Sequence, residues 1–462
     1  MPGGRLPTRE DLDRVVSDLP VYLAAYDGHT GWANSAALAL AKVDAQTTFP
    51  GWGVIVRDGR GEATGVFKEQ AQTLVTAVIP KVSHDEQRAA LRRGVVRANA
   101  LGITSIQNAH GTPEEVELFR EAAEAGELTL RVGVAQTLRP PLPPQRIDEV
   151  RALADRYANG LVRVKAVKIV VDGVIEAHTA AMLAPYTDEA STSGLPAWTQ
   201  DALDDVVARA DRAGLQVYIH AIGDAGVRMA LDTYERARRA NGRSDSRFRV
   251  EHLETIDMAD VPRFASLGVL ASMMPIHADP DSNGAWIDAI GPARSSRGFA
   301  WRLMEKAGAR LMFSSDWPST LTLDPWRGLH CAVNRTNDDG RPVTRARDLR
   351  RERATRLHER SRVCRVRGVD QGHVGGGQGG RPRGVERRPA VTPRELAELK
   401  DRGLVRPAGF EPATYRFVVS GSLNQVNNLS TDEAPGVAPG VHPKGSCWRS
   451  GVTNRPSPLL NA

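Results

Sequence analysis

Cysteine is scarce in this chain of 462 residues, which contains only Cys331, Cys364 and Cys447. An odd number of widely spaced cysteines supports neither a disulfide framework nor a cysteine-based zinc site. The chain also has no uninterrupted apolar run of about 18 residues, the length that a membrane span needs. Its first residues, MPGGRLPTRED, lack the apolar segment of a secretion signal. We therefore expect a cytoplasmic protein with no membrane partner.

An excess of positive charge is missing from most of the chain, although the net charge of the whole sequence is +6. Residues 341–462 contain 23 Lys and Arg against 11 Asp and Glu, whereas residues 1–340 contain 38 against 44. A nucleic-acid-binding surface needs its positive charge on a folded domain. Because the excess lies in a segment rich in Gly, Pro and Arg, the sequence predicts no nucleic-acid partner.

A regular alternation of helix-like and strand-like segments begins at about residue 86. The strand candidates are short β-branched or apolar runs, and the helix candidates carry apolar residues at three- and four-residue spacing. Such alternation predicts an α/β protein with a parallel sheet, either doubly wound or closed into a barrel. The strand candidates are residues 103–109, 130–137, 164–173, 216–223, 248–254, 269–276 and 310–316.

Three of these strand candidates end in a side chain that can bind a metal ion. His220 follows QVYI, His252 follows FRVE, and Asp316 follows RLMFSS. A single histidine of this kind is more simply explained as part of a core or a cap, but the carboxyl ends of all barrel strands meet at one face. Two imidazoles and a carboxylate suit a divalent ion such as Zn²⁺, and a carboxylate there can also accept a proton from water.

A lysine inside an apolar run is a fourth candidate for the same site. Lys168 lies within VKAVKIVVDG (164–173), where burial of its charge is costly unless the charge is neutralised or used. The alternative is a lysine whose amine reaches solvent at the sheet edge. That alternative suits the neighbouring Lys165 better.

Several longer stretches resemble the amidohydrolase superfamily, in its YtcJ-like (amidohydrolase-3) branch. They include LPVYLAAYDGHTGWANSAALALA (19–41), YIHAIGDAGVRMALDTYERA (218–237), GVLASMMPIHADPD (268–281) and FSSDWPSTLTLDPW (313–326). The resemblance covers roughly residues 10–338. It implies a (β/α)8 TIM-like barrel and a metal-dependent hydrolase that acts on C–N bonds, often in amides other than ordinary peptide bonds. A divalent metal, with zinc as the first expectation, and a small-molecule amide substrate are implied as well.

Carried over by position, the resemblance implies roles for individual residues. His220 and His252 match the metal-ligand histidines that close strands five and six of the family barrel. Asp316 matches the last-strand aspartate, which binds metal and acts as the general base. Lys168 matches the strand-four lysine, which similar enzymes can carbamylate into a metal-bridging ligand.

Two further positions match the surroundings of the family's substrate pocket. His29 lies in DGHTGWANS, and Asp172 lies in VVDG. The resemblance therefore implies that both are substrate-binding residues. For His29, a structural role in its loop is an equal alternative.

The chain also departs from the family pattern at its first strand. That strand ends in two metal-ligand histidines separated by one residue, and nothing in this sequence matches them. We therefore expect a barrel that lacks its first strand, with residues 1–85 as an inserted N-terminal segment and 86–340 as the incomplete barrel. This reading treats the N-terminus as truncated and predicts at most one bound ion and feeble hydrolysis.

The segment 341–462 does not resemble the family at all. Residues 351–390 contain 11 Arg and 8 Gly but no Lys, which is typical of a disordered basic tail. A sharper interpretation is a reading-frame shift. Codons chosen for this stretch can be read one base further on as an amphipathic helix, a Gly-Lys turn and an apolar strand. Both interpretations predict a non-native or disordered tail without a packed core.

Two rival functions stay open at the level of the sequence. A catalytically inactive remnant would share the barrel fold but would not need to bind metal. A Rossmann-like oxidoreductase has little support, because no GxGxxG follows the first strand. The sequence names no leaving group for the substrate, and it is compatible with a homo-oligomer.

Overall fold

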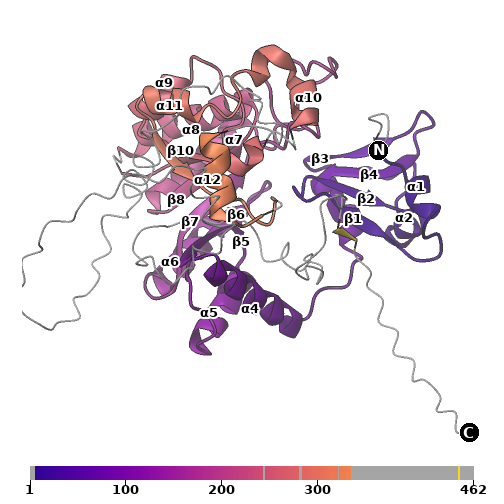
Figure 1. The fold of residues 1–462 in the computed structure, drawn as a ribbon, viewed down its shortest axis with the longest axis horizontal. Helices are drawn as coiled ribbons and strands as arrows, with labels where there is room; N and C mark the ends of the chain where they lie inside the picture. Colours follow the sequence, from indigo (N-terminus) through magenta and orange to yellow (C-terminus); the bar gives the residue numbers. More distant parts are fainter. Residues whose placement is uncertain (1–5, 243–244, 280–282, 321, 335–445, 448–462) are drawn as a thin grey trace, which may run out of the picture.

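The computed structural model describes residues 6–242, 245–279, 283–320, 322–334 and 446–447. These residues form two β-sheets, one small and antiparallel, the other larger and parallel. Figure 1 shows the small sheet beside the larger α/β body, with the chain passing from one to the other through helix α4 (His84–Ala100).

The small sheet is built almost entirely from residues ahead of α4. Its strand order is β12-β1-β2-β4-β3. Nine buried residues, among them Phe67 and Val75, form its core. Strands and helices are β1 Tyr22–Ala24, β2 Thr30–Ala33, β3 Gly53–Arg57, β4 Ala63–Glu69, β12 Ser446–Cys447, α1 Arg9–Asp13, α2 Ser35–Ala41, η2 Gln70–Gln72 and α3 Thr73–Thr76.

The large sheet contains seven parallel strands, which confirms the predicted α/β barrel architecture and all seven strand candidates. The strands lie in the same order in space as in the chain, from β5 at one edge to β11 at the other. No pairing joins β5 to β11 in the part of the chain that the structure describes. The strands are β5 Ser105–Gly111, β6 Arg131–Leu138, β7 Val162–Val170, β8 Gln216–Ala221, β9 Arg249–His252, β10 Leu270–Met273 and β11 Arg310–Phe313.

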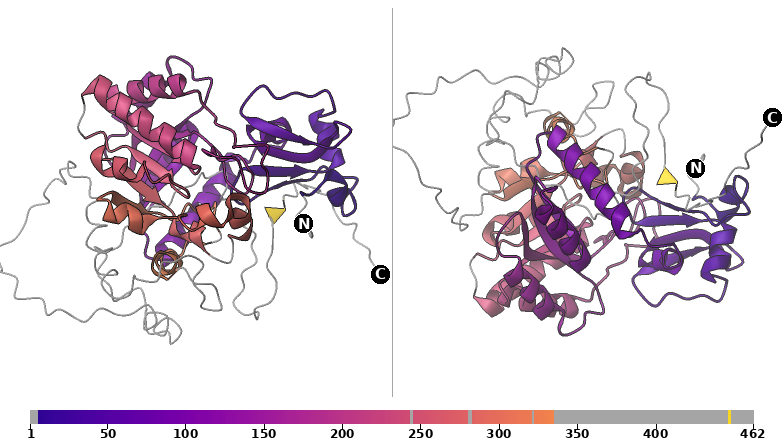
Figure 2. Two further views of the ribbon diagram at one scale, coloured as in Figure 1. Left: turned by 90° about the horizontal axis from the view of Figure 1, so that it is seen from above. Right: turned by 90° about the horizontal axis from the view of Figure 1, so that it is seen from below.

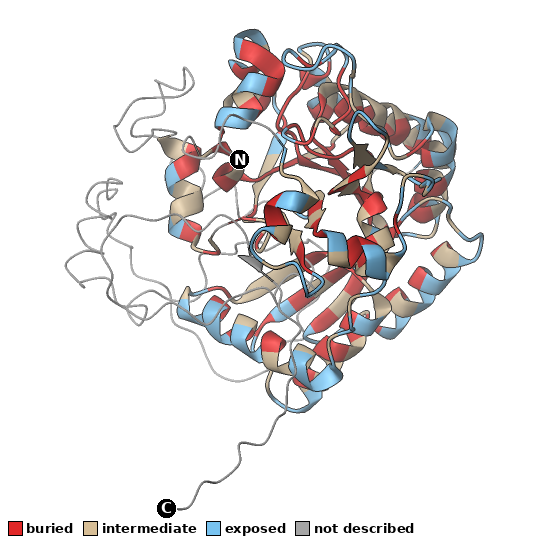
Figure 3. Cartoon of the chain, turned by 90° about the vertical axis from the view of Figure 1, so that its right-hand side faces the viewer, coloured by how far each residue is buried: buried red, intermediate tan, exposed pale blue. Residues whose placement is uncertain are grey.

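Helices cover the outside of this sheet, as Figures 2 and 3 show. Their buried faces lie toward the strands, and their exposed faces lie toward solvent. Capping boxes at Ser83 and Thr112 satisfy backbone amides at the first turns of α4 and α5. The further helices are α5 Pro113–Glu124, α6 Arg146–Arg156, α7 Gln200–Arg212, α8 Asp224–Asn241, α9 Val261–Ser266, η3 Pro275–Ala278, α10 Gly284–Ser295, α11 Trp301–Lys306 and α12 Pro325–Val333.

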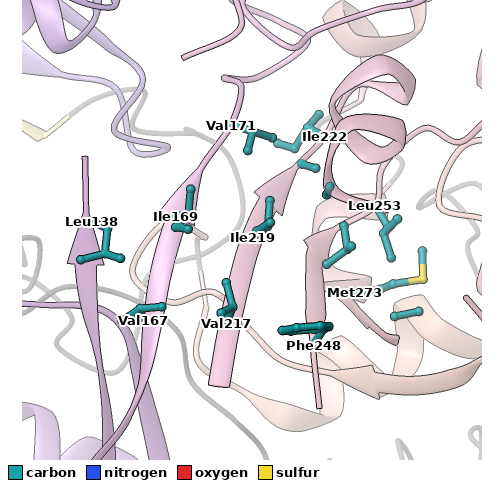
Figure 4. Close-up of a cluster of buried hydrophobic side chains, with 14 of the residues drawn as sticks. Leu138, Val167, Ile169, Val171, Val217, Ile219, Ile222, Phe248, Leu253 and Met273 are labelled. Carbon is teal, nitrogen blue, oxygen red and sulfur yellow. The ribbon is translucent and has the colours of Figure 1, made fainter. Parts of the chain in front are cut away.

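The two faces of the strands differ in chemistry. Val167, Ile169, Val217 and Ile219 belong to the large apolar core beneath the helices (Figure 4). Because side chains alternate along a strand, the residues between them, such as Tyr218, point to the opposite face, inside the barrel. The strand pattern therefore places polar groups in the barrel interior while keeping the outer face apolar.

A long loop, residues 171–199, connects β7 to α7 and carries the contacts with the small sheet. Lys68 donates from Nζ to the carbonyl of Ala177 at 2.7 Å. Trp52 donates from its indole nitrogen to the carbonyl of Leu195, also at 2.7 Å. The small sheet is thus held to the barrel by polar contacts with one loop.

Most of the predicted tail lies outside the described residues. Within 341–462 the structure describes only Ser446–Cys447, which pairs with Tyr22–Ala24 as an antiparallel edge strand. The helices that are described are all too short or too polar to cross a lipid bilayer.

Candidate metal centre

Four of the residues singled out from the sequence meet at the carboxyl ends of the barrel strands. His220 lies on β8, and its ring centroid is 4.3 Å from that of His252 at the end of β9. Asp316 follows β11, and its Oδ2 lies 4.0 Å from Nδ1 of His252. Lys168 lies on β7 and is buried, with Asp316 near enough to act on its charge.

Alternation along the strands explains the direction of Lys168 and His220. Both lie on the same side of their strands as Tyr218, inside the barrel. His252 needs a different explanation, because it directly follows Glu251 and a regular strand would send the two side chains to opposite faces. The backbone at His252 adopts a left-handed φ of 74°, and Asp316 has a φ of 54°. Non-glycine residues held in this region are strained and cluster at functional sites.

A closer group of three includes a histidine that sequence reasoning missed. One ligand atom each from His252, His277 and Asp316 lies within 4.8 Å of the others. His277 lies in η3, directly after β10, and its Nε2 is 3.5 Å from Oδ2 of Asp316. The signal was visible in MMPIHADPD, where a histidine follows an apolar strand. Three residues, 274–276, separate the end of β10 from His277.

Two nitrogens in this group have no hydrogen-bond partner among the described residues. They are Nδ1 of His252 and Nε2 of His277, and both are buried. A buried polar atom without a partner is uncommon and calls for an explanation such as an ion. Two imidazoles and a carboxylate form the kind of donor set that Zn²⁺ and similar ions prefer.

The pKa shifts differ among the residues of the site. Burial acts to lower the pKa of His277, but the hydrogen bond with Glu254 and the charge of Asp316 outweigh it and raise that pKa. Burial lowers the pKa of His252 well below its usual range, and the nearby ionisable groups of His220 and Lys168 lower it further. Burial also lowers the pKa of Lys168, although Glu251 and Asp316 oppose this effect. Neutral imidazole and neutral amine are the forms that bind a metal ion or react with carbon dioxide.

His220 contacts the loop behind the site. Its Nε2 lies 3.2 Å from the carbonyl oxygen of Gly173 and 3.7 Å from Oδ1 of Asp172. The contact with the carbonyl makes Nε2 the donor nitrogen of a neutral ring. The structure therefore places His220 beside the group of three, with its ring against that of His252.

Asp172 is completely buried, and its carboxylate accepts hydrogen bonds from the backbone amides of Ala181, Ile222 and Gly223 at 2.9–3.1 Å. Burial raises the pKa of Asp172 to about 7, and the three amide donors limit the rise. This geometry favours a structural role, because the carboxylate holds the end of β8 to the β7–α7 loop. It offers no open face to a substrate.

His29 reaches the site from the small sheet. Its Nδ1 lies 2.8 Å from Oε2 of Glu69, and its ring centroid is 5.4 Å from that of His220. Burial acts to lower the pKa of His29, but the charge and hydrogen bond of Glu69 outweigh it and raise the pKa to about 9. Glu69 also accepts a 2.5 Å hydrogen bond from the hydroxyl of Thr179 on the β7–α7 loop. Nothing in the sequence marked Glu69 as a site residue. It ends β4, a strand of the small antiparallel sheet that reads as part of an ordinary hairpin.

A second missed histidine lies at the other side of the site. His110 is near the end of β5, and a guanidinium nitrogen of Arg139 lies 2.6 Å from its Nε2. Burial, Arg139, Lys168 and His29 lower the pKa of His110 to about 3. His110 is therefore neutral at ordinary pH. Its position directly after ITSIQNA could have been recognised by the rule that found His220.

Comparison with known proteins identifies a family for this chain. The sequence model described as "Amidohydrolase family" matches residues 1–373. The putative amidohydrolase YtcJ of Bacillus subtilis is 30% identical over 334 residues, which are 71% of this chain and 61% of that protein. The N-substituted formamide deformylase of Arthrobacter pascens is 28% identical over 388 residues, or 81% of this chain and 70% of that protein.

A solved structure is similar as well. An uncharacterized metal-dependent hydrolase from Pyrococcus horikoshii OT3 superposes with a TM-score of 0.54 and 26% sequence identity. The match covers 72% of this chain and 63% of that one. The chain thus spans somewhat less than two thirds of the length of YtcJ and of this hydrolase.

Proposed function

The chain belongs to the amidohydrolase family, and on that premise we propose that it is a metal-dependent hydrolase of C–N bonds in small amides other than ordinary peptide bonds. One observation carries the proposal. Nδ1 of His252 is buried without a hydrogen-bond partner among the described residues and faces the carboxylate of Asp316 at 4.0 Å. The name of the formamide deformylase among the relatives supports the amide class of substrate.

The residues at the strand ends fit a divalent ion, and Zn²⁺ suits their donor atoms best. His220, His252 and Asp316 would hold it, with Lys168 beside them. When bound, such an ion polarises an amide carbonyl and lowers the pKa of a nearby water molecule. Because burial keeps His220 and His252 neutral, both rings offer a lone pair at ordinary pH.

Asp316 is the residue that moves the proton. Its Oδ2 accepts a proton from the attacking water and returns it to the leaving nitrogen. The left-handed backbone at Asp316 and the two imidazoles near Oδ2 restrict where this carboxylate can point. A restricted carboxylate needs little reorganisation when the proton arrives.

His29 binds the substrate from the side of the small sheet. Glu69 holds Nδ1 of His29, so Nε2 is left as the donor for a substrate carbonyl or leaving group. Asp172 acts indirectly, by holding the backbone around His220 in place.

The experiment is hydrolysis of a panel of N-formyl and N-acyl amides by the purified chain, with and without added Zn²⁺. We expect feeble turnover that depends on the ion and that is lost in Asp316→Asn. The control is Asp288→Asn, which changes an exposed aspartate of α10 in the same way. Turnover that survives both chelation and Asp316→Asn would contradict the proposal.

The alternative is an inactive remnant of such an enzyme. It would be favoured if the chain bound Zn²⁺ tightly at this site but hydrolysed no member of the panel. Bound metal is therefore measured in the same samples.

A further inference from the structure

We propose that His277 is itself a ligand of the bound ion and that Glu254 is the positioning residue that aims it. This inference rests on the metal site of the proposed function and extends that site by one ligand. It is carried by a chain of contacts that runs from Trp286 through Glu254 and His277 to Asp316.

The contact between His277 and Glu254 decides which nitrogen faces the site. Nδ1 of His277 lies 3.1 Å from Oε1 of Glu254. A carboxylate oxygen is an acceptor, so Nδ1 carries the hydrogen. In the neutral ring Nε2 is then left with its lone pair, and it faces Oδ2 of Asp316 at 3.5 Å. Two acceptors at that distance repel one another unless a positive charge lies between them.

Glu254 is itself held firmly. Its Oε2 accepts a 2.8 Å hydrogen bond from the indole nitrogen of Trp286, and its backbone carbonyl accepts another from Phe299 at 2.8 Å. The carboxylate is buried. Such a carboxylate behind an imidazole orients the ring and makes its free nitrogen a better ligand.

A metal ion accounts for the geometry more fully than a proton does. A proton on Nε2 of His277 would explain the 3.5 Å approach of that nitrogen to Oδ2 of Asp316. It would leave Nδ1 of His252 without a partner, since that nitrogen lies 4.0 Å from the same Oδ2. The rings of His252 and His277 are nearly parallel, with centroids 5.7 Å apart. One ion beside Oδ2 would give both unpaired imidazole nitrogens a partner, since a ligand atom from each of the three residues lies within 4.8 Å of the others.

The consequence is a centre built across three neighbouring strands. His252 ends β9, His277 follows β10 and Asp316 follows β11. His220 on β8 lies at the margin of this centre, because its Nε2 is engaged by Gly173. The inference thus adds His277 as a ligand to His252 and Asp316, with His220 beside them.

The test is the affinity of the full chain for Co²⁺ and Zn²⁺, measured by titration with a competing chelator, together with the visible absorption of the Co²⁺ form. We expect His277→Ala to weaken binding and Glu254→Gln to weaken it by about 10–100-fold, the range seen when an outer partner of a ligand is lost. The Co²⁺ spectrum should change in both variants. The matched control is His84→Ala, which removes an exposed histidine paired with Glu121.

Circular dichroism establishes that each variant is folded. If His277→Ala is unfolded, His277→Asn, which keeps a polar side chain, is measured with the same criteria. Wild-type affinity and spectrum in a folded His277 variant, with binding lost in His252→Ala, would overturn this inference and leave the metal site of the proposed function standing. No binding by the wild-type chain would overturn both.

Discussion

The small sheet and the barrel both contribute side chains to the site, but they hold these side chains in place differently. The barrel supplies candidate ligands from strand ends that grow out of one large apolar core. The small sheet has a core of nine described residues and brings His29, held by Glu69, to the site. Hydrogen bonds from Trp52, Lys68 and Glu69 join it to the loop 171–199, and the ring of His29 lies beside that of His220 on β8. The difference suggests a division of labour in which the barrel sets the metal geometry and the small sheet adjusts the substrate side.

The largest expected effect lies on the barrel side. Asp316→Asn removes the proton acceptor and weakens one ligand, so we expect kcat to fall by roughly 10²–10⁴. Steady-state hydrolysis and bound zinc, measured on the same preparation, check this. If His29→Ala reduced kcat as much as Asp316→Asn while zinc stayed bound, the division between the two sheets would be wrong.

The next effect tests whether the small sheet is a separate unit of stability. Phe67 is completely buried in its core, and Phe67→Ala should cost about 3–5 kcal/mol there. Hydrogen exchange should accelerate in residues 22–69 and change little in residues 162–221. Val54→Ala, on an exposed position of β3, is the control. Equal acceleration in both regions would mean that the two sheets unfold as one.

A smaller effect is expected at the junction of the two sheets. Glu69→Gln removes the charge that holds His29, and loss of one charge-assisted hydrogen bond should lower kcat/KM about tenfold. Affinity for Co²⁺ should not change, because neither residue belongs to the ligand group. Glu62→Gln, which changes a partly exposed glutamate before β4 in the same way, is the control. A loss of metal affinity in Glu69→Gln would place the small sheet inside the metal centre.

The smallest effect concerns pH and lies within the barrel. The pKa of His110 is lowered to about 3, chiefly by burial and by Arg139. Between the ordinary histidine pKa of about 6.5 and that value, the unfolded chain binds a proton that the folded chain does not. The stabilising contribution is therefore present above about pH 6.5 and is lost as the pH falls toward 3.

His110→Gln should flatten this dependence. Urea unfolding at pH 7 and pH 5 should show a smaller loss of stability in the variant than in the wild type. An identical loss in both proteins would show that His110 is not held neutral by its surroundings.

The barrel strands could be predicted because each is a short apolar or β-branched run in the sequence. Runs such as QVYIHA and VKAVKIVV carry the signal for a buried parallel strand locally. His220, His252 and Asp316 were found because each comes at the end of such a run. Their convergence followed from the architecture alone.

The rest of the site depends on contacts between distant parts of the chain. His277 lies 39 residues before Asp316 in the chain, and Glu69 lies 110 residues before Thr179. No local pattern encodes these pairings. For Asp172 the sequence predicted a position near the site. It could not predict that three backbone amides would donate hydrogen bonds to the carboxylate.

The strand order of the barrel has a consequence for synthesis on the ribosome. Each strand from β6 to β11 pairs with the strand made just before it. A nascent chain can therefore extend the sheet one unit at a time as it emerges at about 5–20 residues per second. Strands β1 to β4 of the small sheet are made first. They must wait for residues 171–199 before they can attach to the barrel. His252 and His277 emerge before Asp316, so the site acquires its carboxylate last. We therefore expect metal uptake to follow completion of the barrel rather than to guide it.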